Sequence, residues 1–269
     1  MRKHILIFII LSSFQIINAQ SYLALVDSAD FYIKNENWVK AESNILSALK
    51  AEPANHNNSL LLSNLATIQR YQKRNSEALN NYSLALYMTP NAITLLNNRA
   101  SLYLEMDSVN AAYQDYDKVI KLDDKDIESR YYHGMIALEN GDMITSKQDF
   151  DSILKINSKS NEGKEGLALW NKLNCHYDEA IALYNQLLKK AASVPLLTNR
   201  AECFLATKQL PAATQDINEA LKINATEGYL YLLKARLNKL RYENEEAINN
   251  GKLAVKYGIN KTIVDKAIK

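Results

Sequence analysis

Apolar positions along the chain recur with the spacing of one helix face. Ala78, Leu79, Tyr82, Ala85 and Leu86 stand at i, i+1, i+4, i+7 and i+8, which is the pattern of an amphipathic α-helix. Polar residues fill the positions between them. The pattern therefore predicts a helix that buries one side and exposes the other.

Turn-forming residues separate these helical segments. Gly141-Asp142 interrupts one segment at its midpoint, and Pro53 and Pro90 follow the ends of two others. Pro211 stands where a helix should begin, a position that tolerates its missing N–H. The content of only 7 Gly and 4 Pro in 269 residues argues against an all-β chain, whose many turns would need both. We expect short antiparallel helices joined by tight turns.

The segments repeat. Asn98-Arg99-Ala100 with Tyr103 recurs as Asn199-Arg200-Ala201 with Phe204, three repeats later. A period of about 34 residues is typical of helical repeat arrays. It predicts seven repeats near 22–58, 59–92, 93–126, 127–160, 161–193, 194–227 and 228–261, followed by a short capping segment, 262–269.

Three positions of the repeat have a fixed size. The eighth residue is always Ala or Gly: Ala29, Ala66, Ala100, Gly134, Ala168, Ala201 and Ala235. The twentieth is Ala or Ser: Ala41, Ala78, Ala112, Ser146, Ala180, Ala213 and Ala247. The twenty-fourth is bulky in six repeats and Gly in the last: Ile45, Tyr82, Tyr116, Phe150, Tyr184, Ile217 and Gly251. Small residues allow paired helices to approach closely, and the bulky ones fill the groove beside them.

This arrangement resembles the tetratricopeptide repeat family, whose repeats carry small residues at positions 8, 20 and 27 and large ones at positions 4, 11 and 24. The resemblance covers about residues 22–261. Position 27 matches in Ala48, Ala85, Ala220 and Ala254, whereas Val119, Ile153 and Leu187 depart from it. The resemblance implies an all-α fold, a right-handed α-solenoid of about seven helix-turn-helix repeats.

It also implies a groove, lined by the first helix of each repeat, that binds an extended peptide or a partner helix. Amides and hydroxyls at groove positions can pair with a peptide backbone. The same residues could instead be solvated or satisfy nearby helix groups. Arg99 and Arg200, close to two of them, could make ion pairs between repeats. The candidate groove residues are Ser63, Asn64, Thr67, Thr94, Asn97, Asn98, Ser101, Tyr131 and Asn199.

The N-terminus has the pattern of a secretory signal peptide. Arg2 and Lys3 precede an apolar run over residues 5–17, and Asn18-Ala19-Gln20 follows. We expect cleavage after Ala19 and export to the periplasm or the exterior of a bacterial envelope; the alternative is an uncleaved anchor. No other stretch is long and apolar enough to predict a membrane span.

The net charge and the absence of catalytic and metal-binding motifs argue against several classes of function. The formal charge of +2 comes from Arg2 and Lys3 in the leader, since the remaining chain has 30 basic and 30 acidic residues. Such a balance argues against a nucleic-acid partner. No phosphate loop or nucleophile elbow occurs, and His56, His133 and His176 lack metal-ligand spacing. The sequence therefore predicts no catalytic, cofactor or metal site and no enzymatic activity.

Two cysteines remain. Cys175 and Cys203 are expected at positions about five residues apart along adjacent first helices, an offset of about 7.5 Å before the helix separation is added. We therefore expect two buried thiols rather than a disulfide.

The leading hypothesis is an exported, non-enzymatic scaffold that binds protein or peptide segments. The alternative is an accessory or ligand-sensing subunit of an envelope enzyme or secretion assembly. At the C-terminus, Ile263, Val264, Ala267 and Ile268 offer an apolar face. The short segment either covers the last repeat or leaves that face to a partner or a second copy of the chain, and the sequence leaves both open.

Overall fold

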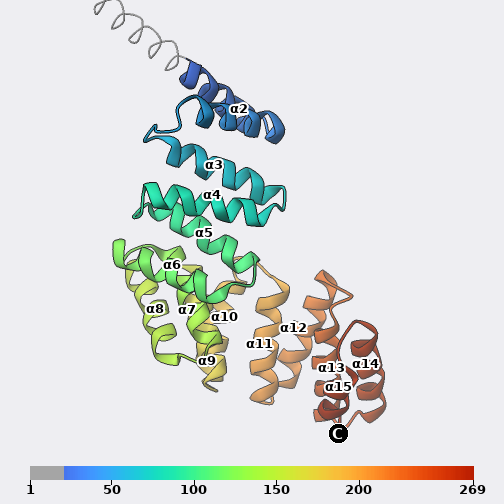
Figure 1. The fold of residues 1–269 in the computed structure, drawn as a ribbon. Helices are drawn as coiled ribbons and strands as arrows, with labels where there is room; N and C mark the ends of the chain where they lie inside the picture. The colour runs from blue at the N-terminus through green and yellow to red at the C-terminus, as the bar shows by residue number, and fades with distance from the viewer. Residues whose placement is uncertain (1–20) are drawn as a thin grey trace, which may run out of the picture. The chain divides into compact units, whose positions relative to one another are not determined.

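The computed structural model describes residues 21–269, and the predicted signal peptide lies outside them. Every regular element in this range is helical (Figure 1). Contacts divide the chain at residue 129 into a first unit, described from residue 21 to 129, and a second unit, residues 130–269. Each unit is treated by itself below.

The first unit begins with a helix over residues 21–34. It continues with α2 (Trp38–Ala51), α3 (Asn58–Tyr71), α4 (Asn75–Met88), α5 (Ile93–Glu105), α6 (Val109–Leu122) and the first turn of α7 (Ile127–Glu139). Successive helices pack against each other, α3 on α4 and α5 on α6 most extensively.

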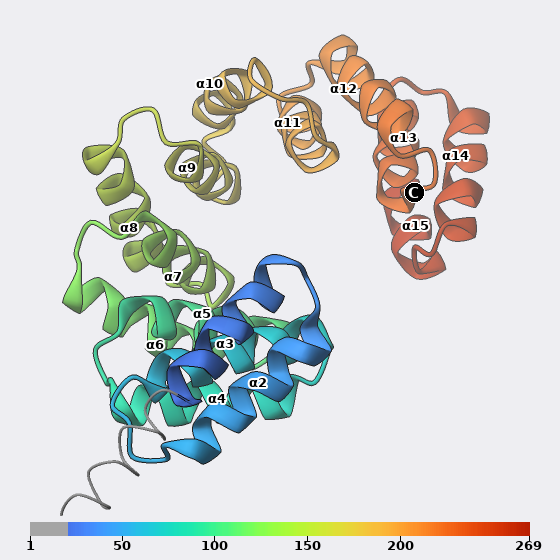
Figure 2. The ribbon, with the colours of Figure 1, turned by 90° about the horizontal axis from the view of Figure 1, so that it is seen from above.

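The second unit holds the rest of α7 and the helices up to the C-terminus. These are α8 (Met143–Ile156), α9 (Asn161–Leu173), α10 (Tyr177–Leu188), α11 (Val194–Ala206), α12 (Leu210–Ile223), α13 (Gly228–Leu240), α14 (Asn244–Lys256) and α15 (Lys261–Ala267). Again each helix packs on the next, as α13 and α14 do side by side in Figure 2. The predicted all-α fold of consecutive helix pairs is confirmed.

The columns of fixed size form the interior of both units. Every alanine at positions 8 and 20 is at most 1% exposed, and so is every bulky side chain at position 24. Because Ala carries no side chain beyond Cβ, the two helices of a pair can approach until the position-24 side chain fills the remaining space. The repeated small and bulky positions in the sequence therefore correspond to buried positions in the helix packing.

Phe150 of α8 shows how tight this packing is. Its ring lies against the backbones of α7 and α9 at two glycines: a Cβ built on Gly134 would come within 2.8 Å of the ring, and one on Gly166 within 2.3 Å. No real Cβ makes such contacts, so both glycines are required by close approach rather than by backbone conformation.

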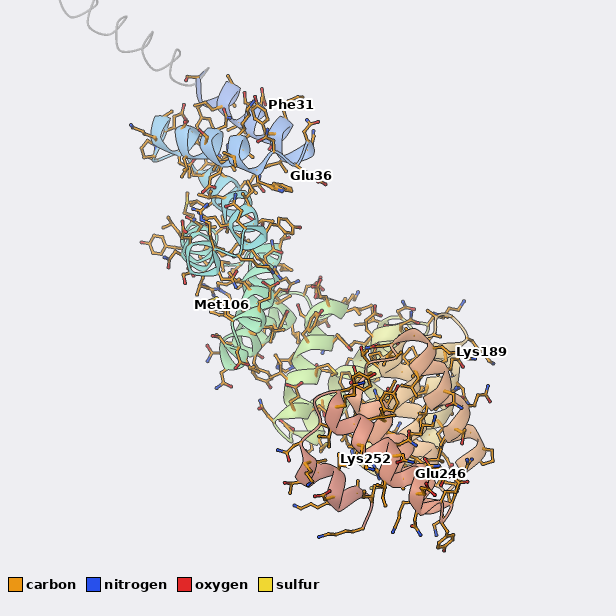
Figure 3. All side chains as sticks on the ribbon, turned by 90° about the vertical axis from the view of Figure 1, so that its right-hand side faces the viewer. Phe31, Glu36, Met106, Lys189, Glu246 and Lys252 are labelled. Atoms are coloured by element: carbon orange, nitrogen blue, oxygen red, sulfur yellow. The ribbon has the colours of Figure 1, made fainter. Side chains whose placement is uncertain are left out.

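Position 15 of each repeat adopts the left-handed conformation. The turn between the paired helices places φ at +54° to +64° in Glu36, Lys73, Asp107, Cys175, Lys208 and Tyr242, and at +80° in Gly141. Glu36 marks the first of these turns in Figure 3. Glycine adopts this region without steric cost, and only the fourth repeat has a glycine here, Gly141. The other six repeats place a residue with a side chain in the left-handed region, which costs free energy.

We expect glycine at this position to stabilise the protein. Tyr242 is 90% exposed, so Tyr242→Gly removes the left-handed penalty with little loss of packing and should raise the free energy of unfolding by about 0.5–1 kcal/mol. The matched change Gly141→Ala should lower it by a similar amount. Urea unfolding followed by circular dichroism measures both; a Tyr242→Gly variant less stable than the parent would contradict the argument.

The prediction of two buried thiols is wrong for one of them. Cys203 is buried in α11, where burial raises the pKa of its thiol to about 11. Cys175 is exposed because it occupies the left-handed turn after α9 rather than a helix face. Both are free thiols in the structure.

Arg99 and Arg200 connect three helices each, which differs from the predicted ion pairs between repeats. Arg99 binds both carboxylate oxygens of Asp115 at 2.8 Å, within its own helix pair, and donates to Ser83 of the preceding α4 at 3.2 Å. The ion pair lies inside a repeat, and only the hydrogen bond crosses to the neighbouring one.

Arg200 repeats this geometry in the second unit. It binds Asp216 at 2.8 and 2.6 Å and donates to Asn185 of the preceding α10 at 2.6 Å. In the repeat of α7 and α8, His133 takes the arginine's place, with its Nδ1 2.6 Å from Asp149.

The last repeat is covered by α15. Gly251 stands at the position that is bulky elsewhere, and Val264 of α15 fills the space, 2.8 Å from a Cβ built on that glycine. Val264 is buried, as is Leu232 of α13, against which it packs. The sequence left open whether this segment covers the last repeat. The structure shows that α15 covers part of it, through Val264.

Candidate functional site

The first unit contains a pocket of about 370 Å³ between α3, α4 and α5. It brings together two of the predicted groove residues, Thr67 of α3 and Asn98 of α5. They lie on first helices of neighbouring repeats, so the pocket opens on the face where the groove was expected. Its lining residues are Thr67, Arg70, Tyr71, Lys73, Tyr82, Asn98 and Glu105.

Two hydroxyls form the floor of this pocket. Thr67 Oγ1 lies 2.9 Å from the carbonyl of Ser63 and 2.8 Å from Tyr82 Oη. A threonine hydroxyl has one proton, and if it donates that proton to the Ser63 carbonyl, Tyr82 is the donor to Thr67. Burial raises the pKa of Tyr82, so its hydroxyl keeps its proton and can donate it to Thr67.

An ion pair bounds one side of the pocket. Arg70 donates from Nε and Nη2 to Glu105 Oε1, at 3.1 and 2.8 Å. This pairing lowers the pKa of Glu105 and raises that of Arg70. Lys73, in its left-handed turn, adds a second cation at the rim. The pocket therefore presents both charge signs and selects for neither alone.

An aromatic wall completes it. Tyr71 is 66% exposed, and its ring centroid lies 5.6 Å from that of Trp38 in α2, with the planes tilted by 32°. Trp38 contacts one side of the Tyr71 ring, and the rest of the ring is exposed. An exposed aromatic ring offers a large contact area at low entropic cost.

Asn98 is the free polar group of the pocket. Its side chain is half-buried and makes no hydrogen bond with the described residues, and the same holds for Asn64, the equivalent amide of α3. Each amide thus offers two N–H donors and one acceptor to a ligand. Ser63 is half-buried close to this floor, and Thr94 is exposed at the start of α5.

The remaining predicted residues take part in internal contacts. Asn97 Oδ1 accepts a hydrogen bond from Ser129 at 2.7 Å, and Ser101 lies 3.4 Å from the Tyr116 hydroxyl. Tyr131 packs edge-on to Tyr132, and burial raises its pKa to about 12. These three are less available to a ligand than Asn98.

Asn199, the counterpart of Asn98 in the second unit, is engaged by a lysine. Lys172 of α9 donates to Asn199 Oδ1 at 2.6 Å and pairs with Glu202 at 2.5 Å. Tyr229 of α13 donates to the other oxygen of Glu202. A closed polar network of this second unit therefore stands where the first unit has an open pocket.

The sequence missed five lining residues for three reasons. Arg70, Tyr71 and Glu105 lie on the same first helices as Thr67 and Asn98, but their side chains are not the amides and hydroxyls that pair with a peptide backbone. Tyr82 was assigned to packing alone, although its hydroxyl reaches the pocket floor. Lys73 belongs to a turn, and only the left-handed bend carries it to the rim.

Residues 21–269 hold neither a cluster of metal ligands nor a membrane-spanning helix. No group of three or more His, Cys, Asp or Glu in this range could hold a metal ion. No helix in it is both long and apolar enough to cross a bilayer.

Comparisons with known proteins agree with the helical repeats. Residues 93–126 match the family described as Tetratricopeptide repeat. The crystal structure of a tetratricopeptide repeat protein from Parabacteroides merdae is 31% identical, with 93% of this chain and 98% of that chain covered and a TM-score of 0.73. The solved structure of YrrB, described as a TPR protein with an unusual peptide-binding site, is 13% identical over 69% of this chain and 96% of its own, at a TM-score of 0.53.

A curated relative is similar over a shorter region. The chicken (Gallus gallus) DnaJ homolog subfamily C member 3 is 29% identical over an alignment of 173 residues, which covers 57% of this chain. The match spans about a third, 34%, of that protein's length. On the nearly full-length match to the Parabacteroides protein and on the repeat match, the chain belongs to the tetratricopeptide repeat family.

Proposed function

We propose that the protein is an exported, non-enzymatic scaffold that binds an extended peptide segment in the pocket of Thr67 and Asn98. The observation that carries the proposal is the unpaired Asn98 amide beside the exposed Tyr71 ring in a pocket of about 370 Å³. Membership of the family supports a protein-binding role in general.

The pocket suits a main chain with one anchoring side chain. Asn98 can donate to a peptide carbonyl and accept from a peptide N–H. The Tyr71 ring would pack on an aromatic or prolyl side chain. Lys73 and Glu105 at the rim would favour a segment of mixed charge over a highly charged one.

A library of phage-displayed linear peptides tests this directly. We expect selection on the protein to enrich a sequence family, and Asn98→Ala to weaken its binding about tenfold through one lost hydrogen bond and a stranded partner. Tyr71→Ala should weaken it at least as much. Asn110→Ala, an exposed asparagine on α6, is the matched control and should leave the dissociation constant unchanged. Enriched peptides that bind all three variants equally would contradict the proposal.

The export part of the proposal rests on residues 1–19. Intact-mass measurement on protein recovered from the envelope or medium should show a chain beginning at Gln20. Retention of Met1 in that fraction would contradict cleavage, and recovery from the cytoplasm alone would contradict export.

A further inference from the structure

One buried hydroxyl of the second unit has no hydrogen-bond partner. Tyr184 of α10 is 0% exposed, and its Oη makes no hydrogen bond with the residues that the structure describes. Leu169 stands at the ninth position of the same repeat and has no polar group to offer. In the first unit, each tyrosine equivalent to Tyr184 lies within hydrogen-bond distance of a hydroxyl at the ninth position. Those pairs are Tyr82 with Thr67 at 2.8 Å and Tyr116 with Ser101 at 3.4 Å.

Two carboxylates lie near this hydroxyl. Burial raises the pKa of Tyr184, and the charges of Glu165 and Glu202 are among those that raise it further. Glu165 belongs to α9 and Glu202 to α11. Figure 2 shows these two helices on the inner side of the second unit, with α10 and α12 outside them. The unpartnered hydroxyl therefore points into a region of negative potential between two first helices.

Glu165 is the one of these two carboxylates that lacks a cation. Both oxygens of Glu202 accept a hydrogen bond, one from Lys172 and the other from Tyr229. Glu165 is half-buried and forms no hydrogen bond or ion pair within the described part of the chain. Burial raises the pKa of Glu165, and the charge of Glu162 raises it further. The carboxylate has thus lost part of its hydration without gaining a partner, and a cation would compensate for that loss.

A second tyrosine hydroxyl lies near Glu165. After burial, the charge of Glu165 contributes most to the raised pKa of Tyr131 on α7. The Tyr131 side chain is half-buried, and its hydroxyl has no hydrogen-bond partner among the described residues. Because both tyrosine hydroxyls are neutral, each can accept a hydrogen bond. One carboxylate and two neutral hydroxyls match the three N–H donors of an alkylammonium group.

We propose that Glu165 binds the ammonium group of a lysine side chain from a partner protein, with the hydroxyls of Tyr184 and Tyr131 as its further acceptors. The lysine enters from the inner side of the second unit. The half-buried Leu169 turns aside and opens the Tyr184 hydroxyl to it. A metal ion does not fit, since residues 21–269 hold no group of three or more ligands for one.

Titrations of the full chain followed by amide NMR test the site, because they measure weak binding and locate it. The probes are two N-acetylated, C-amidated hexapeptides, one with a central lysine and one with norleucine there, which keeps the chain but not the ammonium. We expect the lysine peptide to shift the signals around Glu165 and to bind about tenfold more tightly than the norleucine peptide. Equal binding of the two peptides, or no binding up to about 1 mM, would overturn the proposal.

Glu165→Gln removes the charge and keeps the shape of the side chain. It should weaken binding of the lysine peptide about tenfold. Glu179→Gln, at an exposed side chain on α10, is the matched control and should leave the dissociation constant unchanged. Asn98→Ala should leave it unchanged as well, so this site and the first-unit pocket can fail separately. A lysine peptide that binds Glu165→Gln as it binds the parent, or that is lost in Asn98→Ala, would contradict the assignment.

Tyr184→Phe tests the unpartnered hydroxyl. Since Tyr184 Oη makes no hydrogen bond in the free protein, its removal should not lower the midpoint of urea unfolding. Tyr82→Phe, which removes the contact with Thr67, should lower that midpoint. Tyr184→Phe should nevertheless weaken binding of the lysine peptide about threefold, because one acceptor is gone. A variant that binds the peptide like the parent would exclude this hydroxyl from the site.

Discussion

Arg200→Met should destabilise the protein by about 3–5 kcal/mol, the usual cost of breaking a buried ion pair. The substitution keeps an apolar chain of similar length but removes the partner of Asp216, which is 1% exposed. Arg200 supplies both of its hydrogen bonds, at 2.8 and 2.6 Å. The hydrogen bond to Asn185 is lost as well. Because Asn185 belongs to α10 of the preceding repeat, the packing between the two repeats is weakened too.

Urea unfolding compares this variant with Lys121→Met. Lys121 pairs with Asp117 at 2.6 Å, but both side chains are exposed, and such a pair contributes about 0.3–0.5 kcal/mol. Replacing both members of the buried pair, as in Arg200→Met with Asp216→Leu, should recover most of the loss because no charge is left buried. Equal shifts for Arg200→Met and Lys121→Met would show that burial does not govern the effect.

Gly166→Ala should also destabilise, although alanine is the better helix former. The new Cβ would lie 2.3, 2.4 and 2.6 Å from three atoms of the Phe150 ring. Overpacking of this severity costs about 3 kcal/mol. The gain in helix propensity offsets about 1 kcal/mol of it, so the free energy of unfolding should fall by about 2 kcal/mol.

Gly163→Ala, one turn earlier on α9, is the matched control. Its Cβ would lie 2.8 Å from Leu154 Cδ2 and 2.9 Å from both Leu154 Cγ and Ile153 Cγ2. Ile153 is fully buried, but the half-buried Leu154 can shift, so this variant should lose less stability than Gly166→Ala. Adding Phe150→Leu to Gly166→Ala should reduce the combined loss below the sum of the two single losses. A Gly166→Ala variant as stable as the parent would mean that α9 shifts freely on α8.

Much of the fold could be predicted from residue size alone. The Ala, Gly or Ser at positions 8 and 20 is buried in every repeat, and the bulky side chain at position 24 is buried in each repeat that has one. Gly251 departs from that pattern, and nothing in its own repeat explains why. The cause is Val264, which arrives from a helix outside the repeat.

The candidate site could be predicted only in part. Position within the repeat selected Thr67 and Asn98, which share the pocket. It also selected Asn199, which an internal lysine binds, and Asn97, which accepts from Ser129. The availability of an amide depends on which long side chain reaches it from the neighbouring helix. That is a property of the packed pair of repeats and not of either repeat's sequence.

The sequence by itself determined the helix pairs, because periodicity and residue size are local properties repeated seven times. The sequence also determined the net charge, because that charge depends only on the numbers of basic and acidic residues. Only the tertiary structure decided which polar groups remain free, which thiol is exposed and where the last helix stops short. Those outcomes depend on contacts between residues about 15 to 35 positions apart, such as Arg200 with Asp216 and Lys172 with Glu202, whose geometry exists only after the helices have packed.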